Sequence, residues 1–199
     1  MRIEKQLDQV RKFYHLREGE FYHSIDHVRK MLKIFYENES EINKYYPDLD
    51  KDILIDSILY HDAGYEPGNP KNEENATIIY MNVADKSISQ QHKIIVVEAI
   101  LGTVPFIHEM HETDYEKLLH DLDWFNFSND EFIKAEPLIR NEYKQVSDEE
   151  FYKARLEFYE KCIEHYGIHL YESKVFEKYN RIAYENIKNR INELKKYVS

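Results

Sequence analysis

The sequence is poor in cysteine, glycine and proline, and this scarcity excludes several classes of protein. Its 199 residues include one cysteine, Cys162, five glycines and five prolines. A single cysteine excludes an intramolecular disulfide and a cysteine-rich zinc site, and it suits a reducing compartment. With 42% hydrophobic residues, the chain is neither collagenous, disordered nor dominated by linkers. We expect one folded domain over residues 1–199.

Long hydrophobic runs are also missing. No stretch of about 18 apolar residues, the length that a membrane-spanning helix needs, occurs in the sequence. Residues 1–16 alternate charged and apolar residues and contain no apolar run of signal-peptide length. We therefore expect a cytoplasmic protein that does not contact a membrane.

Positive charge is in deficit, because 27 Lys and Arg residues face 38 Asp and Glu residues, for a net charge of -11. A field of this sign repels phosphate backbones, so we expect no nucleic-acid polymer as a partner. A small anionic substrate needs a local cation that overrides the field, either a metal ion or a few Lys and Arg side chains. A metal site is therefore the first feature to seek.

Apolar residues recur at helical spacing along almost the whole chain, which predicts an all-α fold. Ser24, Asn72 and the Ser147–Glu150 capping box mark expected helix starts, and Pro137 should kink or restart its helix. The last two helices are expected to form an antiparallel pair packed on the rest. The expected helices cover residues 2–17, 24–37, 49–61, 72–84, 88–102, 114–127, 130–145, 147–166 and 173–197, with boundaries uncertain by about 2–4 residues.

Histidine and aspartate occur together at three places in apolar helical segments. His23 and His27 lie four residues apart, His61 and Asp62 end an apolar helix, and Asp123 interrupts another. Taken singly, such a His is more often a helix cap and such an Asp a solvated charge. Together they form a nitrogen and oxygen donor set that suits a divalent ion of Mn, Fe, Co, Ni or Zn. A carboxylate on an apolar helix face also needs a partner, because burial of an unpaired charge is costly.

The order of these residues resembles the signature of the HD superfamily of metal-dependent phosphohydrolases, and more narrowly a predicted HD phosphohydrolase family. The similarity extends over about residues 7–192. It rests on YHSIDHV (22–28), HDAGY (61–65), NE (72–73), LD (122–123), RNEY (140–143) and AYEN (183–186).

The resemblance implies an all-α HD-domain helical bundle, here with an additional C-terminal helical pair. It also implies one divalent metal held by His27, His61, Asp62 and Asp123. Asp121 is the rival of Asp123, but two residues on a helix point about 200° apart, so only one of them can face the ion directly.

Other histidines raise the question of a second metal, since some HD enzymes are binuclear. His92 lies on the expected helix 88–102, and His108 and His111 follow Gly102 in an expected loop. The alternative, which we favour for His111, is a solvated polar loop. We expect one metal and leave a second open.

Phosphate recognition is expected from Arg140 and Arg155, because a guanidinium binds phosphate oxygens with two parallel hydrogen bonds. Lys71, close after the His-Asp turn, is a third candidate. The alternative for each Arg is a buried ion pair with Glu142, Glu150 or another acid.

The sequence departs from the pattern of the resembling family at two places. Acidic Glu20 stands two residues before Tyr22-His23, where a basic residue is expected, and residues 63–66 lack the Glu-Asp pair of the guanosine-tetraphosphate hydrolases.

The sequence therefore suggests metal-dependent hydrolysis of a small phosphorylated metabolite, with nucleotides among the candidates. Asp62 is expected to orient the attacking water and His23 to donate a proton to the leaving group. One alternative is an HD-type di-iron oxygenase that uses His92 and His108. Another is a nucleotide-sensing binding module with a weak catalytic site.

Overall fold

The computed structural model describes residues 2–106 and 111–198, and every regular element in these residues is a helix, as the periodicity predicted. No helix in the described part is long and apolar enough to cross a membrane. The α-helices are α1 (Arg2–Val10), α2 (Ile25–Glu37), α3 (Glu39–Tyr45), α4 (Lys51–Tyr60), α5 (Asn72–Val83), α6 (Gln90–Leu101), α7 (Asp114–Asp123), α8 (Glu131–Glu142), α9 (Asp148–Tyr166) and α10 (Asn180–Tyr197). The 3-10 helices are η1 (Arg11–Phe13), η2 (Trp124–Ser128) and η3 (Glu177–Tyr179).

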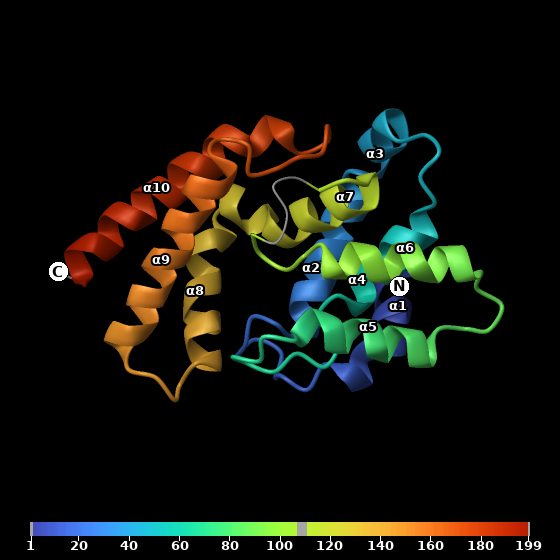
Figure 1. The fold of residues 1–199 in the computed structure, drawn as a ribbon, viewed down its shortest axis with the longest axis horizontal. Helices are drawn as coiled ribbons and strands as arrows, with labels where there is room; N and C mark the ends of the chain where they lie inside the picture. Colours follow the sequence, from blue (N-terminus) through green and yellow to red (C-terminus); the bar gives the residue numbers. More distant parts are fainter. Residues whose placement is uncertain (1, 107–110, 199) are drawn as a thin grey trace.

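The helices form two groups, which Figure 1 shows on opposite sides of the molecule. The first group consists of α1 to α7. α4 lies within it and contacts α1, α2, α5, α6 and α7. The second group consists of α8, α9 and α10, and α9 and α10 run in opposite directions as predicted (Figure 1). η2 contacts α7, α8 and α10, so it joins the two groups.

The apolar sequence of α4 explains its central position. Ile53, Leu54, Ile55, Ile58 and Leu59 are all buried, so this helix has apolar side chains on nearly every side. Such a helix is stable only when neighbours surround it. The main hydrophobic cluster extends from Leu7 to Leu194 and includes residues of both groups.

Two expected helices have other bounds in the structure, and one helix was not expected. The first helix ends as an α-helix at Val10 rather than at residue 17, and α3 forms where no helix was expected. α3 has a weak sequence signal because Ile42 is its only buried residue. The last helix begins at Asn180 instead of residue 173, because the Asn180 side chain bonds both the N–H and the carbonyl of Tyr171 and ties the preceding turn and η3 into a loop.

The expected helix starts are only partly correct. Ser147 forms the predicted capping box with Glu150. Ser24 precedes α2 but its hydroxyl donates to the carbonyl of Phe21, and Asn72 binds the backbone of Glu66 instead of capping α5. α8 continues through Pro137 without restarting.

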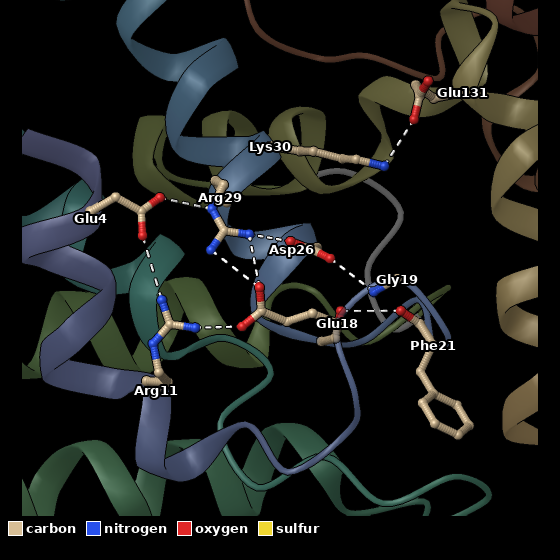
Figure 2. A network of polar contacts seen from close by, with 10 residues as sticks. Glu4, Arg11, Glu18, Gly19, Phe21, Asp26, Arg29, Lys30 and Glu131 are labelled. Carbon is tan, nitrogen blue, oxygen red and sulfur yellow. Dashed lines mark hydrogen bonds and ion pairs between the residues drawn. The ribbon is translucent and has the colours of Figure 1, made fainter. Parts of the chain in front are cut away.

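A network of charged side chains holds the loop that leads into α2 (Figure 2). Arg29 donates to Glu4 at 2.9 Å and also pairs with Glu18 and Asp26. Asp26 in turn accepts the N–H of Gly19 at 2.9 Å. Single exposed ion pairs contribute little, but a connected set can restrict a loop. The network therefore fixes the chain just before the segment that carries His23 and His27.

The turn after α4 depends on Gly64, whose φ of +75° lies in the left-handed region. Its N–H donates to the carbonyl of Phe13 at 2.9 Å. A Cβ at this position would lie 2.6 Å from Cδ1 of Ile79. The backbone conformation therefore favours glycine here, and a Cβ would also have to displace the end of the Ile79 side chain.

We predict that Gly64→Ala destabilises the protein more than Gly68→Ala. Gly68 also has a positive φ, of +81°, but a Cβ there would meet nothing within 4 Å. Left-handed strain should cost both variants about 1–2 kcal/mol, and displacement of Ile79 should add about 1 kcal/mol or more to Gly64→Ala. Urea unfolding measures the difference; equal losses would contradict the role of the Ile79 contact.

Candidate metal centre

Three helices bring predicted ligands to one place. His27 lies in the first turn of α2, His61 directly follows α4, and Asp123 is the last residue of α7. One ligand atom from each of these side chains lies within 4.8 Å of the other two. α2, α4 and α7 contact one another, so packing of the helices sets these separations.

Asp62 contributes a second carboxylate to this cluster. Its Oδ2 lies 2.9 Å from Nε2 of His61 and 3.9 Å from Nε2 of His27. Oδ1 of Asp123 lies 2.8 Å from Nε2 of His27 and 4.0 Å from Nε2 of His61. Two imidazole nitrogens and two carboxylate oxygens thus face a common space.

Two of these atoms are buried and lack hydrogen bonds with any described residue. They are Nε2 of His61 and Oδ2 of Asp62, which are close together but not aligned for a hydrogen bond. Nδ1 of His61 faces the carbonyl of Ile58 at 2.9 Å, so it carries the proton and leaves the Nε2 lone pair directed at the cluster. Buried polar atoms without partners are rare and costly. A divalent cation would satisfy both, so the residues present fit a metal ion.

Charge coupling within the cluster is strong. Burial lowers the pKa of His61, but the negative charges of Asp62 and Asp123 outweigh it and raise this pKa to about 9. Burial raises the pKa of Asp62, but the neighbouring histidines outweigh it and hold this pKa well below its usual range. The two carboxylates therefore stay ionised and attract a cation, and metal binding would displace protons from the imidazoles.

A pocket of about 500 Å³ adjoins the cluster, between α8 and α9 on one side and the ends of α4 and α7 on the other. Asp62 and Asp123 line it, and so do Tyr22 and Tyr65, which lie within the YHSIDHV and HDAGY motifs. Tyr65 also stacks on the ring of His23, with the ring centroids 3.9 Å apart. A small molecule in this pocket would therefore lie directly against the ligand cluster.

His23 lines the same pocket and is held by Glu142 of α8. Its backbone N–H and its Nδ1 each lie 2.7 Å from a different oxygen of the Glu142 carboxylate. Burial lowers the pKa of His23, but the hydrogen bond to Glu142 and the negative charges of Asp62, Glu142 and Asp123 together outweigh it and raise the pKa overall. Glu142 was not predicted as a site residue. The signal was available, because Phe132, Ala135, Ile139 and Glu142 follow the helical spacing of one buried face.

Glu73 is a second pocket residue that the sequence reasoning did not assign. It lies in the first turn of α5 and lines the pocket. Burial raises its pKa, and the charges of Asp62 and Asp123 add to the effect. Only its position directly after Asn72, within the NE motif, could have indicated it.

The predicted phosphate contacts separate into one residue at the pocket and two elsewhere. Arg155 lines the pocket; its guanidinium donates to the Tyr159 hydroxyl at 2.7 Å, and its Nε is buried without a hydrogen-bond partner in the described structure. Arg140 instead joins the end of α8 to the start of α9, donating to Asp148 at 2.8 Å and to the carbonyls of Tyr143 and Val146. Lys71 is exposed, with Glu74 at 3.7 Å, and does not line the pocket.

The rival carboxylate Asp121 lies away from the ligand cluster. It is buried, and its two oxygens accept the N–H groups of Glu172 and Ser173 at 3.0 and 2.8 Å. Its role in this structure is to hold the segment after α9. The two histidines considered for a second metal do not join the ligand cluster in the described residues. Nε2 of His92, on α6, lies 3.0 Å from the carboxylate of Asp56, on α4. His108 lies outside the described residues.

The expectation that His111 belongs to a solvated loop is wrong. His111 is buried, and its two ring nitrogens each lie 2.8 Å from an oxygen, of Glu172 and of the Gly102 carbonyl. His120 and Glu172 complete a second cluster of potential ligands with it. Because two acceptors occupy its ring, His111 is doubly protonated and offers no lone pair to a metal. Tertiary contacts with Glu172, 61 residues away, caused the difference.

Comparisons of the chain with protein-family models, with curated proteins and with solved structures find no match. The resemblance to the HD phosphohydrolases therefore stays a prediction from the motifs. Any function proposed for the chain has to follow from the geometry of the site.

We predict that His120 makes the protein less stable as the pH falls from about 6.5 to 4. Burial lowers the pKa of His120 to about 4, from 6.5, and the neighbouring His111 adds to the shift. The unfolded chain therefore binds a proton that the folded chain does not, which costs up to about 3 kcal/mol across this window. His120→Gln, which keeps a donor for the Leu170 carbonyl, should lose less stability on acidification.

Urea unfolding at a series of pH values measures this effect. His169→Gln is the control, because His169 is exposed and should leave the pH dependence unchanged. An identical pH dependence in wild type and His120→Gln would contradict the prediction.

Proposed function

We propose that the protein is a metal-dependent hydrolase of small phosphate esters. The observation that carries this proposal is the cluster of two imidazoles and two carboxylates at one end of a pocket, with two buried ligand atoms that lack hydrogen bonds. A mixed nitrogen and oxygen set of this kind suits divalent ions of Mn, Fe, Co, Ni or Zn. The HD-like order of the same residues adds to this support.

His27, His61, Asp62 and Asp123 would hold the ion. A divalent ion, when bound, supplies a Lewis acid that makes water more acidic and polarises a phosphoryl oxygen. The two carboxylates balance its charge, and the Ile58 carbonyl keeps His61 in the tautomer that binds through Nε2. The chain thus supplies both the ligands and their orientation.

Asp62 and His23 have the proton-handling roles in this proposal. Asp62 lines the pocket, so its carboxylate can accept a hydrogen bond from an attacking water and orient it. Glu142 accepts the Nδ1 proton of His23 and favours its charged form, which can donate a proton from Nε2 to the leaving oxygen. Tyr65 stacks on this ring and limits its rotation.

Arg155 supplies the positive charge of the protein itself. Its guanidinium lies 4.6 Å from the centre of the Tyr159 ring and makes no ion pair with a described acid, so its charge is available to an anion. Arg140 cannot share this task, because its nitrogens bind Asp148 and two carbonyls. The net charge of -11 makes this local cation important for attracting a phosphate.

No observation in the described residues favours the di-iron oxygenase, since His92 binds Asp56 and belongs to neither cluster of potential ligands. A sensing module with the same ligands would bind a phosphate ester without hydrolysing it. Phosphate release from a panel of nucleotides and sugar phosphates, measured on the metal-reconstituted protein, tests the proposal. Absence of release from every ester would contradict it.

We predict that Asp123→Ala abolishes metal binding whereas Asp121→Asn retains it. Wild type should hold about one ion per chain and Asp123→Ala less than about a tenth, since loss of one of four ligands removes most of the affinity. Asp121→Asn should instead lower the melting temperature, because an amide cannot accept both N–H groups, at a cost of about 1–3 kcal/mol. Elemental analysis and thermal unfolding of both variants are the measurements; metal loss confined to Asp121→Asn would reverse the assignment.

We also predict that Glu142→Gln lowers kcat by about 10- to 100-fold at unchanged metal content, because His23 loses the charge that holds its proton. The control is Glu136→Gln, a second buried acid on α8, which pairs with Arg190 away from the pocket. This variant should lose stability but keep kcat per folded molecule. Steady-state kinetics on the ester of the panel that is hydrolysed best measure kcat for both variants. An equal fall in kcat in both variants would show that Glu142 acts through stability alone.

A further inference from the structure

The pocket has two chemically different ends. His23, Asp62, Glu73 and Asp123 form the polar end beside the ligand cluster. An apolar wall comes from η2, α8, the segment after α8, and α9, which contribute Trp124, Phe127, Ile139, Val146, Phe151 and Phe158. A molecule that fills the pocket therefore presents polar groups at one end and apolar surface at the other.

Polar side chains near the apolar wall make hydrogen bonds within the protein. The Asn126 amide donates to the Tyr22 hydroxyl at 3.2 Å, and the Thr103 hydroxyl donates to the Ile100 carbonyl at 2.7 Å. The Glu150 carboxylate accepts both the N–H and the hydroxyl of Ser147, at 2.9 and 2.8 Å. A sugar placed against this wall would meet mostly apolar side chains, and burial of its hydroxyl groups there would be costly.

Charge in the pocket limits the number of phosphate groups. Among its described lining residues, Arg155 is the only Lys or Arg, whereas Asp62, Glu73, Asp123 and Glu150 are acidic. A metal ion would balance Asp62 and Asp123, which leaves one guanidinium for the ligand. One phosphate group matches this arrangement, and a triphosphate would meet uncompensated repulsion.

We infer that the pocket takes the phosphate monoester of an aromatic or bulky apolar alcohol. The phosphate lies at the ligand cluster and the apolar group lies against the wall of η2, α8 and α9. This ligand class rests on the proposed hydrolase function and narrows its substrate from small phosphate esters in general. A volume of about 500 Å³ accommodates one or two rings.

Trp124 makes the inference measurable without turnover. It is the only tryptophan in the chain, and it lies in the apolar wall next to Phe127, with ring centroids 5.2 Å apart, and to Phe158, at 6.0 Å. A ring that enters the pocket changes the surroundings of the only indole. Its fluorescence therefore reports occupation of the apolar end directly.

The binding experiment compares benzylphosphonate with methylphosphonate, two non-hydrolysable probes that differ by the phenyl ring. Titrated into the metal-reconstituted protein, benzylphosphonate should bind at least 10-fold more tightly and change the Trp124 emission, since burial of a phenyl group is worth about 1.5–3 kcal/mol. Phe158→Leu should weaken benzylphosphonate by about 3- to 10-fold and leave methylphosphonate unchanged. Phe125→Leu is the matched control, because Phe125 packs on Phe176 and Tyr179 outside the pocket.

The turnover experiment compares benzyl phosphate, ribose 5-phosphate and ATP. The first two release a primary alcohol, so a difference in kcat/KM reflects binding of the rest of the molecule. We expect benzyl phosphate to exceed ribose 5-phosphate by at least 10-fold, with ATP the poorest. Hydrolysis that favours ribose 5-phosphate or ATP would overturn the inferred ligand class but would still support the proposed hydrolase function.

The remaining outcomes separate the two proposals. Ring-dependent binding without hydrolysis of any ester would overturn the hydrolase and support the apolar ligand class. Equal binding of the two phosphonates, with no response of Trp124, would overturn the ligand class whatever the outcome of the turnover experiment.

Discussion

The burial of α4 is the constraint on which the candidate site depends. Its apolar side chains face neighbours on nearly every side, so α1, α2, α5, α6 and α7 must all pack against it. The chain leaves this helix at His61 and Asp62, which therefore emerge in the interior and not at the surface. Because α2 and α7 pack on the same helix, His27 and Asp123 arrive within 4.8 Å of His61.

Burial of the two carboxylates in the cluster has a considerable electrostatic cost. Isolated carboxylates are expensive to bury, yet Asp62 and Asp123 remain ionised because the imidazoles beside them supply positive charge. Nε2 of His61 and Oδ2 of Asp62 still lack hydrogen bonds, in a chain whose other buried acids are well paired with backbone or basic groups. Two such atoms from neighbouring residues, side by side at one end of a pocket, indicate a site arranged for a ligand.

The two helix groups have different tasks in this arrangement. The first group supplies the four residues of the ligand cluster, and α8 and α9 supply the apolar wall, Arg155 and the carboxylate of Glu142. η2 connects them directly after Asp123, so the last ligand and the start of the wall are neighbours in the chain. The second group thus determines what lies beyond the ligand cluster, and with it the substrate class.

Periodicity was enough to predict the all-α fold and most helix ranges, because these depend on residues close in sequence. The grouping of His27, His61, Asp62 and Asp123 was predicted from the resemblance of their order to a known motif. Tertiary structure alone decided that Arg155 reaches the pocket and Arg140 does not, and that Glu142 holds His23, 119 residues away. It likewise buried His111 against Glu172. A long polar side chain pairs with whichever group packing brings near it, and that choice depends on the relative placement of helices, which no local pattern records.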